Sequence, residues 1–186
     1  MAHRGNLFVI SGPSGVGKGT LVARVIECLD HVWVSVSATT RKPRDGEIDG
    51  VHYRFMSNEE FDALVEQDGF LEWAGVHSKR YGTPRAPIEA HLNDGDTVIL
   101  EIDVQGAFQV KEKMPEAHLV FIDAPSVEVI EKRLRGRGTE SDDVIAARMR
   151  TALVELSQKE KYDYVLVNDD LDRAVETLVS YIEQQA

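Results

Sequence analysis

The chain has 186 residues, of which 42% are hydrophobic, and a formal net charge of −11 from 21 basic and 32 acidic residues. This length is typical of one compact unit with a sizeable core, and the acidic balance argues against binding to nucleic acid or to an anionic membrane. Neither a signal peptide nor a long apolar span is evident, so we expect a cytoplasmic protein.

The first elements along the chain predict a phosphate site. An apolar strand at 7–11 leads into a Gly-rich loop spaced G-x-x-x-x-G-K, which ends at Lys18, and a helical pattern covers 17–30. Glycines let backbone N–H groups point at a polyphosphate, the helix N-terminus adds partial positive charge, and Lys18 supplies a mobile cation. A purely structural turn is the alternative, but strand, loop, lysine and helix together favour a nucleoside triphosphate site. The residues expected to bind it are Gly12, Pro13, Ser14, Gly15, Val16, Gly17, Lys18, Gly19 and Thr20.

The residue after Lys18 departs from the usual pattern. Gly19 stands where most such loops carry the Ser or Thr whose hydroxyl contacts Mg²⁺. Either Thr20 takes over this contact, or phosphate oxygens and water hold the metal, which suits the reluctance of Mg²⁺ to dehydrate. Mg²⁺ bound together with the triphosphate is the expected cofactor.

Short apolar runs alternate with helical patterns along the core of the chain. Strands are predicted at 7–11, 32–37, 97–102, 118–122 and 164–167, and helices at 17–30, 104–113, 126–136, 142–160 and 171–184. This alternation is typical of a parallel sheet with helices on both faces, so we predict a three-layer α/β core. Cys28, the single cysteine, lies at an apolar position of the first helix and is interpreted as a buried thiol.

The stretch from 37 to 93 interrupts this alternation and is interpreted as an inserted subdomain. A capping box formed by Ser57 and Glu60 opens one helix, and a second helix is predicted near 84–93. The insertion lies between the second and third core strands in the chain.

A second anion site is predicted within this insertion. Arg41 and Arg44 lie three residues apart among hydroxyl groups, and two guanidinium groups that converge suit a dianionic phosphate. Tyr53 and Tyr81 offer phenolic O–H donors nearby. A solvated basic loop is the alternative, but the triphosphate loop already present favours a second phosphate pocket.

Two carboxylates lie at the end of the third core strand. Glu101 and Asp103 lie where open α/β sheets bind their ligands, and they could orient Mg²⁺-bound water, the ribose or the arginines. The string from Asp103 to Gly106 also matches the D-x-x-G of GTPases. No N-K-x-D string for base recognition follows, and a GTPase would leave the arginine pair without a role, which argues against that class.

The charged segment 137–150 resembles a mobile flap. Arg133 and Arg137 are four residues apart, and hence on one face of a helix that persists that far, while Arg148 approaches from the next helix. Two further arginines are expected to be solvated, Arg135 and Arg150.

Several segments taken together resemble the guanylate kinase family, essentially from end to end. They are GPSGVGKGT, SATTRKPRDGEIDGVHYRF, FLEWAGVHSKRYGT, LEIDVQGA, and RLRGRGTE followed by AARM. Many families share the phosphate loop, whereas the motif from Arg41 to Glu47, Glu72-Trp73 and Tyr81-Gly82-Thr83 are specific in combination. The resemblance implies a P-loop kinase fold and transfer of the γ-phosphate of ATP to GMP, giving ADP and GDP.

The resemblance also implies roles for residues at matching positions. The GMP phosphate would be held by Arg41, Arg44, Tyr53 and Tyr81, and guanine would be read by Ser37, Glu72 and Thr83, with Glu47, Glu101 and Asp103 completing the expected GMP site. The ATP phosphates and the γ-phosphoryl group in transfer would be held by Lys18, Arg133, Arg137 and Arg148. Asn168, which follows the last strand, either approaches the adenine or only forms a turn.

The chemistry of guanine independently supports Glu72 as the residue that reads the base. Guanine presents N1–H and N2–H₂ side by side, and one ionised carboxylate accepts both, while the hydroxyls of Ser37 and Thr83 donate to O6. Adenine has an acceptor at N1 and a donor at its six-position, so both contacts would be mismatched. We expect no general base, because a phosphate oxygen of GMP is already a nucleophile.

This interpretation divides the chain into a core at 1–36, 94–132 and 151–186, a GMP-binding subdomain at 37–93 and a lid at 133–150. Two other functions stay open. A kinase for another monophosphate would not share the combination of base-reading residues, and a binding module that docks phosphorylated peptides typically has a degraded phosphate loop. The expected partners are ATP and GMP. Tolerance of dGMP, and the choice between a monomer and a homo-oligomer, stay open.

Overall fold

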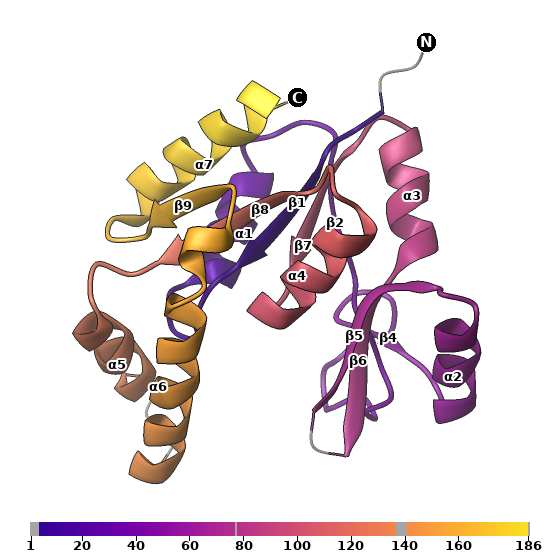
Figure 1. The fold of residues 1–186 in the computed structure, drawn as a ribbon, viewed down its shortest axis with the longest axis horizontal. Helices are drawn as coiled ribbons and strands as arrows, with labels where there is room; N and C mark the ends of the chain where they lie inside the picture. Colours follow the sequence, from indigo (N-terminus) through magenta and orange to yellow (C-terminus); the bar gives the residue numbers. More distant parts are fainter. Residues whose placement is uncertain (1–3, 77, 137–140, 186) are drawn as a thin grey trace.

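The computed structural model describes residues 4–76, 78–136 and 141–185 (Figure 1). A parallel sheet of five strands has the order β2-β7-β1-β8-β9. Its strands are β1 (Leu7–Ser11), β2 (Val32–Val34), β7 (Thr97–Glu101), β8 (His118–Asp123) and β9 (Tyr164–Val167). The helices are α1 (Lys18–Ile26), α2 (Asn58–Glu66), α3 (Arg85–Asn93), α4 (Val104–Lys113), α5 (Val127–Arg135), α6 (Asp142–Leu156) and α7 (Leu171–Gln185), with a 3₁₀ turn at Lys159–Lys161.

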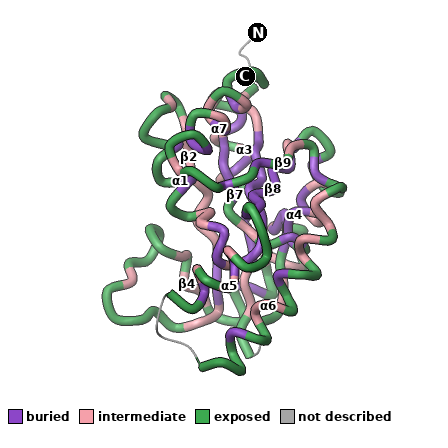
Figure 2. The backbone as a smooth tube through the Cα atoms, turned by 90° about the vertical axis from the view of Figure 1, so that its left-hand side faces the viewer, coloured by how far each residue is buried: buried purple, intermediate pink, exposed green. Residues whose placement is uncertain are grey.

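The central strand β1 shows why this core has three layers. Its residues are buried throughout, and successive side chains point to opposite faces of the sheet. Leu7 and Val9 belong to the apolar cluster that includes the buried residues of α3 and α4. Phe8 and Ile10 belong to the cluster that includes those of α1 and α7. Buried residues run through the sheet in Figure 2, and the predicted three-layer α/β fold is confirmed.

A smaller mixed sheet follows β2 and holds the predicted insertion. Its order is β4-β3-β6-β5, built from β3 (Ala38–Thr39), β4 (Arg54–Phe55), β5 (Phe70–Val76) and β6 (Lys79–Pro84). Helix α2 covers it, with Phe61 stacked on Phe70 at 4.4 Å between ring centroids. The predicted capping box is present: the Ser57 hydroxyl accepts from the backbone N–H of Glu60, and the Glu60 carboxylate accepts from that of Ser57.

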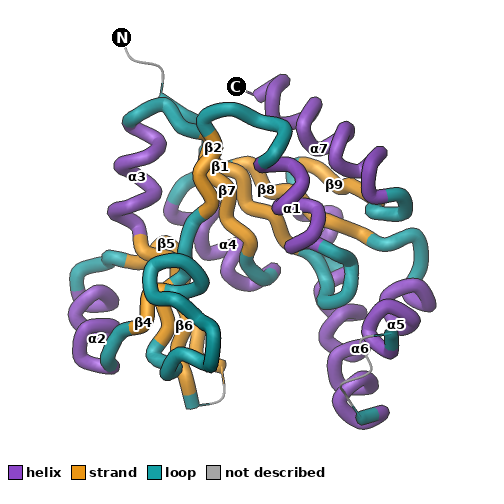
Figure 3. The backbone as a smooth tube through the Cα atoms, turned by 180° about the vertical axis from the view of Figure 1, so that it is seen from behind, coloured by secondary structure: helices purple, strands orange, loops and turns teal. Residues whose placement is uncertain are grey.

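Two projections flank the carboxyl edge of the main sheet. The small sheet with α2 extends on one side of that edge, and the pair α5 and α6 extends on the other (Figures 1 and 3). The loop after β1 and the residues after β7 lie between these two projections. Within the described residues, no helix combines the length and the apolar character needed to cross a bilayer.

Several predicted boundaries differ from the structure. The strand predicted at 32–37 ends at Val34, because the chain then leaves the main sheet for the small one. The helix predicted at 142–160 ends at Leu156 and is followed by the 3₁₀ turn. Helix α1 ends at Ile26 rather than residue 30, so Cys28 lies beyond it and is exposed. The prediction of a buried thiol was wrong. It assumed that the helix continued through Cys28 with its apolar face toward the core, and the helix ends before that residue.

Candidate active site

The phosphate loop has the backbone geometry that its glycines permit. Gly12, Gly15 and Gly17 all have positive φ, and a Cβ at Gly12 would lie 2.2 Å from the carbonyl oxygen of Ile122. Helix α1 begins directly after Gly17, so its first N–H groups face the loop. The ammonium group of Lys18 bends back over the loop and donates to the carbonyl oxygens of Gly12 at 2.6 Å and Pro13 at 3.1 Å.

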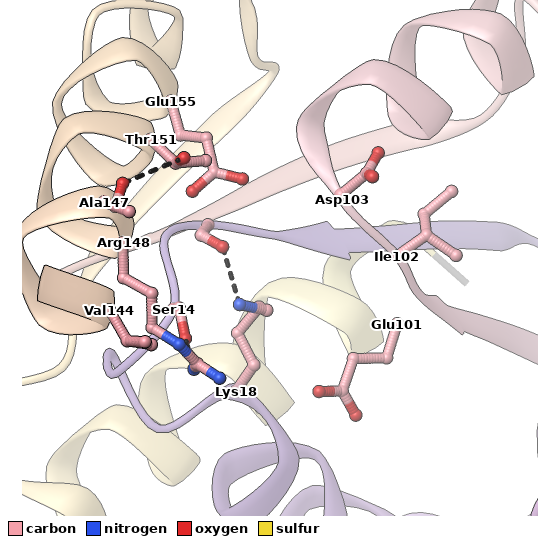
Figure 4. Close-up of a pocket in the computed structure, with 11 residues that line it drawn as sticks. Ser14, Lys18, Glu101, Ile102, Asp103, Val144, Ala147, Arg148, Thr151 and Glu155 are labelled. Carbon is pink, nitrogen blue, oxygen red and sulfur yellow. Dashed lines mark hydrogen bonds between the residues drawn. The ribbon is translucent and has the colours of Figure 1, made fainter. Parts of the chain in front are cut away.

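A cavity of about 780 Å³ lies between this loop, the end of β7 and α6. Figure 4 shows Arg148 extending from α6 to the loop beside Lys18. Arg148 donates to the hydroxyl of Ser14 at 3.1 Å. Two cations from α1 and α6 therefore converge on the loop, which is the arrangement that binding of a polyphosphate requires.

Acidic side chains also line the same cavity. Glu101 and Asp103 line it from the end of β7, and Glu155 lines it from α6, the helix that also carries Arg148. Burial raises the pKa of Glu101, and the charge of Lys18 opposes this rise. Burial likewise raises the pKa of Glu155, which Lys18 again opposes and Asp103 reinforces. The cavity thus presents two cations near the loop and carboxylates from both β7 and α6.

The sequence-based prediction missed Thr151 and Glu155, which line this cavity beside Arg148. Arg148, Thr151 and Glu155 are separated by three and four residues, so they lie on one face of α6. Helical spacing from Arg148 was therefore the signal that could have found them.

A smaller cavity of about 280 Å³ adjoins the loop at the start of α1. Thr20 and Glu101 line it together with Lys18. A hydroxyl and a carboxylate are hard oxygen donors of the kind that Mg²⁺ accepts. In the part of the chain that the structure describes, no group of three or more His, Cys, Asp or Glu side chains is placed to hold a metal ion. These donors fit a metal that arrives with the phosphates rather than one held in an all-protein site.

Arg133, predicted to clamp phosphates, contacts the backbone of the loop. Its guanidinium group donates to the carbonyl oxygen of Val16 at 3.3 Å and to that of Asn168 at 3.0 Å. The buried side-chain amide of Asn168 also donates to the Val16 oxygen, at 2.7 Å. The end of β9 and helix α5 are thus fastened to the phosphate loop. Arg137 lies outside the described residues, whereas Arg135 forms ion pairs with Glu131 and Asp142.

The predicted base-reading pair is assembled on the small sheet. Glu72 on β5 lies opposite Thr83 on β6, and the Thr83 hydroxyl donates to the Glu72 carboxylate at 2.6 Å. Both side chains are buried. Burial raises the pKa of Glu72, the bond from Thr83 opposes the rise, and the charge of Asp103 adds to it. Ser37 is half-buried directly before β3, in the same sheet.

The predicted GMP-phosphate residues gather at the other end of this sheet. The guanidinium group of Arg41 makes two bonds of 2.8 Å to the Glu47 carboxylate and lies 5.3 Å from the ring centre of Tyr53. The rings of Tyr53 and Tyr81 meet edge to face. Arg44 is exposed, and its backbone N–H donates to Glu47 at 2.7 Å.

Glu47 was predicted as a GMP-binding residue, and its contacts show how it acts on Arg41. The bonds from Arg41, followed by that from the Arg44 backbone, lower the pKa of Glu47 to about 2. The carboxylate is therefore ionised at neutral pH, and it holds the Arg41 fork in one orientation.

Comparison with known proteins agrees with this arrangement. A model of the guanylate kinase family matches residues 4–185. The guanylate kinase of Synechococcus sp. (strain CC9902) is 50% identical over 186 residues, which is 100% of both chains. That of Synechocystis sp. (strain ATCC 27184 / PCC 6803 / Kazusa) is 50% identical over 98% of this chain and 95% of its own.

Among solved structures, guanylate kinase from Anaplasma phagocytophilum superposes with a TM-score of 0.78 at 33% identity, covering 98% of this chain and 87% of that one. TT1252 from Thermus thermophilus, at 16% identity and a TM-score of 0.58, shares the fold alone. With the phosphate loop, the Glu72–Thr83 pair and the Arg41 cluster all in place, the chain belongs to the guanylate kinase family.

Proposed function

We propose that this protein transfers the γ-phosphoryl group of ATP to GMP, giving ADP and GDP. The observation that carries the proposal is the pairing of two sites at one edge of the sheet. A phosphate loop with converging Lys18 and Arg148 lies on one side, and a buried Glu72–Thr83 pair with the Arg41 cluster lies on the other. Asp103 is shared, since it lines the first site and raises the pKa of Glu72 in the second.

GMP would be oriented from both of its ends. Ionised Glu72 would accept N1–H and N2–H₂ of guanine, and Ser37 would supply a hydroxyl donor for O6. The single hydroxyl proton of Thr83 is already donated to Glu72, so Thr83 would hold that carboxylate in place rather than donate to O6 as the sequence predicted. At the other end, Arg41 and Arg44 would bind the phosphate with the Tyr53 and Tyr81 hydroxyls. Glu47 acts through Arg41, because a carboxylate cannot itself attract a phosphate dianion.

The transfer step would be assisted by position and charge rather than by a base. A phosphate oxygen of GMP attacks the γ-phosphorus while the bond to the β-phosphate oxygen of ATP breaks. Lys18 and Arg148, which both contact the loop, would stabilise the charge that accumulates on the transferring group, and backbone N–H groups of the loop would receive the ADP phosphates. Arg133 and Asn168 keep that loop in place through Val16.

Mg²⁺ would bind with ATP in the small cavity lined by Thr20 and Glu101. Thr20 and Glu101 would hold the ion there, and it would supply positive charge that neutralises part of the phosphate charge. The expected arrangement of the chain as core, GMP-binding subdomain and lid, and the expected cytoplasmic location, stay predictions.

The decisive experiment compares ADP release with GMP, AMP, CMP and UMP as acceptors. We expect GMP to exceed each of the others in kcat/KM by about 10³-fold or more, since buried polar contacts reject a base that lacks their partners. Arg41→Ala should raise the KM for GMP by about ten- to a hundredfold and leave the KM for ATP nearly unchanged. Similar rates with two or more bases would refute the substrate assignment.

A further inference from the structure

Helix α4 of the core makes a row of contacts along β5, the strand that carries Glu72. β5 is an outer strand of the small sheet, with β6 on one side only. The free edge of an outer strand exposes backbone N–H and C=O groups that need partners. Side chains of α4 provide them here.

Gln109 makes the most specific of these contacts. The backbone N–H of Trp73 donates to the side-chain oxygen of Gln109 at 3.2 Å, and the Gln109 amide nitrogen donates to the carbonyl oxygen of Trp73 at 3.4 Å. One side-chain amide therefore supplies the donor and the acceptor that a neighbouring strand would supply. It does so at the residue next to Glu72.

Other residues of α4 set the surroundings of this contact. Gly106, three residues before Gln109, leaves room for Glu72: a Cβ there would lie 3.0 Å from a carboxylate oxygen. Leu71 is fully buried in the cluster that contains Val104, Ala107 and Val110 of α4. Both neighbours of Glu72 in the chain are thus held by the same helix, Leu71 through packing and Trp73 through hydrogen bonds.

A third contact extends the row away from Glu72. Lys113, four residues after Gln109, donates to the carbonyl oxygen of Phe70 at 2.7 Å and to the Asp68 carboxylate at 2.6 Å. This contact also joins α4 to β5 and is also polar. The Lys113 contact lies at the start of β5, where Leu71 separates Phe70 from Glu72, whereas the Gln109 contact is made to the residue next to Glu72.

We propose that Gln109 is a positioning residue for selection of the base, because its amide fixes the main chain of Trp73 and thereby aims the Glu72 carboxylate at guanine. The inference rests on the proposed function, since it assumes that Glu72 reads the base of the acceptor. Gln109 touches neither nucleotide nor the reacting atoms in this account. Its effect is to keep two carboxylate oxygens in register with two N–H donors, and misplacement by about 1 Å weakens such recognition strongly.

The test compares Gln109→Leu with Lys113→Met. Gln109→Leu keeps a side chain of similar size and removes both hydrogen bonds to Trp73. Lys113→Met removes the polar contact at the start of the strand, so it controls for loss of stability in the same helix–strand junction. For each variant we would measure Tm, the KM for GMP and for ATP, and kcat/KM for GMP and AMP.

We expect Gln109→Leu to lower the ratio of kcat/KM for GMP over AMP about tenfold and to raise the KM for GMP, with the KM for ATP within about twofold of wild type. Lys113→Met should lower Tm and keep the ratio. The inference would be overturned if Gln109→Leu left the ratio of kcat/KM for GMP over AMP unchanged. It would also be overturned if this ratio fell in both variants in proportion to the loss of Tm. If Gln109→Leu does not fold, Gln109→Met is judged by the same criteria.

The wild-type protein separates this inference from the proposed function. If the wild type does not prefer GMP, the proposed function fails and takes the role of Gln109 with it. If the wild type prefers GMP while the Gln109 variants keep that preference, only the role of Gln109 is refuted.

Discussion

Single charged side chains in this protein differ in the partners that fix them. Lys18 donates to the backbone carbonyl oxygens of Gly12 and Pro13 in its own loop, and phosphate oxygens would replace these acceptors when a nucleotide binds. Arg41 is held in a two-bond fork by Glu47. Glu72 is buried with one hydroxyl donor, which leaves acceptor capacity on its carboxylate for two N–H groups of guanine.

Lys18→Ala is expected to reduce kcat by at least about a hundredfold, because it removes a cation from the phosphates where charge develops. The fold should persist, since the substitution leaves the buried apolar clusters on both faces of the sheet intact. Lys79→Ala, at an exposed lysine of the β5–β6 hairpin, is the matched control and should retain full activity. The measurement is steady-state turnover together with the far-UV circular dichroism of each variant. A Lys18→Ala protein with near-normal kcat would refute a role for this lysine in transfer.

The raised pKa of Glu72 predicts an acid limb in the pH profile for GMP. The carboxyl must be ionised to accept two N–H groups, so kcat/KM for GMP should fall as pH decreases through that raised pKa, above the ordinary carboxyl range. Glu72→Gln should lose this limb, whereas ionisation of the GMP phosphate affects both enzymes equally. Identical profile shapes in wild type and variant would contradict the assignment.

The raised pKa of Glu72 makes the free energy of unfolding change with pH in the opposite direction to kcat/KM. The folded chain binds this proton more tightly than the unfolded chain does. The contribution of Glu72 to the free energy of unfolding is therefore present below the ordinary carboxyl pKa and is lost as pH rises through the raised value.

At the scale of elements, the site depends on contacts between segments that are distant in the chain. Asn168, which follows β9, and Arg133 of α5 both donate hydrogen bonds to the carbonyl oxygen of Val16 in the phosphate loop. Arg133 also donates to the backbone carbonyl oxygen of Asn168. α4 holds β5 through Gln109. The phosphate loop is thus held in place by β9 and α5, and the base-reading strand β5 is held in place by α4.

Asn168→Ala is expected to raise the KM for ATP several-fold and to leave the KM for GMP unchanged. The variant removes a buried 2.7 Å hydrogen bond to Val16, so the free energy of unfolding should also fall by about 1–3 kcal/mol. Asp169→Ala, which removes the exposed ion pair with Arg173, is the control and should change neither KM. Separate titrations of the two nucleotides check the prediction, and equal weakening of both would indicate a general loss of structure.

At the scale of the whole molecule, the two projections stand on opposite sides of the cavity. The small sheet carries the groups for the acceptor nucleotide, and α6 carries Arg148, Thr151 and Glu155 toward the phosphate loop (Figures 1 and 4). Transfer to GMP rather than to water requires that solvent be excluded from between them. An approach of both projections to the core would achieve this.

Hydrogen exchange should therefore report two separable closures. GMP alone is expected to protect 37–76 and 78–92, and ATP is expected to protect mainly 141–150 and the phosphate loop. Both regions should be protected when both sites are saturated with GMP and a non-hydrolysable ATP analogue. Unchanged exchange in both regions under that condition would refute closure.

The sequence by itself determined those features that depend on local spacing. The phosphate loop follows from glycines and Lys18 in fixed order between a strand and a helix, and the capping box follows from Ser57 and Glu60 three residues apart. The parallel sheet follows from apolar runs that alternate with helical patterns. In each case the residues that decide the outcome lie within a few positions of one another.

Only the tertiary structure decided which distant groups meet. Asn168 reaches Val16 and Gln109 reaches Trp73 because helices and strands pack in one particular arrangement. Cys28 is exposed because α1 ends two residues earlier than its position. Such contacts depend on packing between elements far apart in the chain, and no spacing between neighbouring residues encodes them.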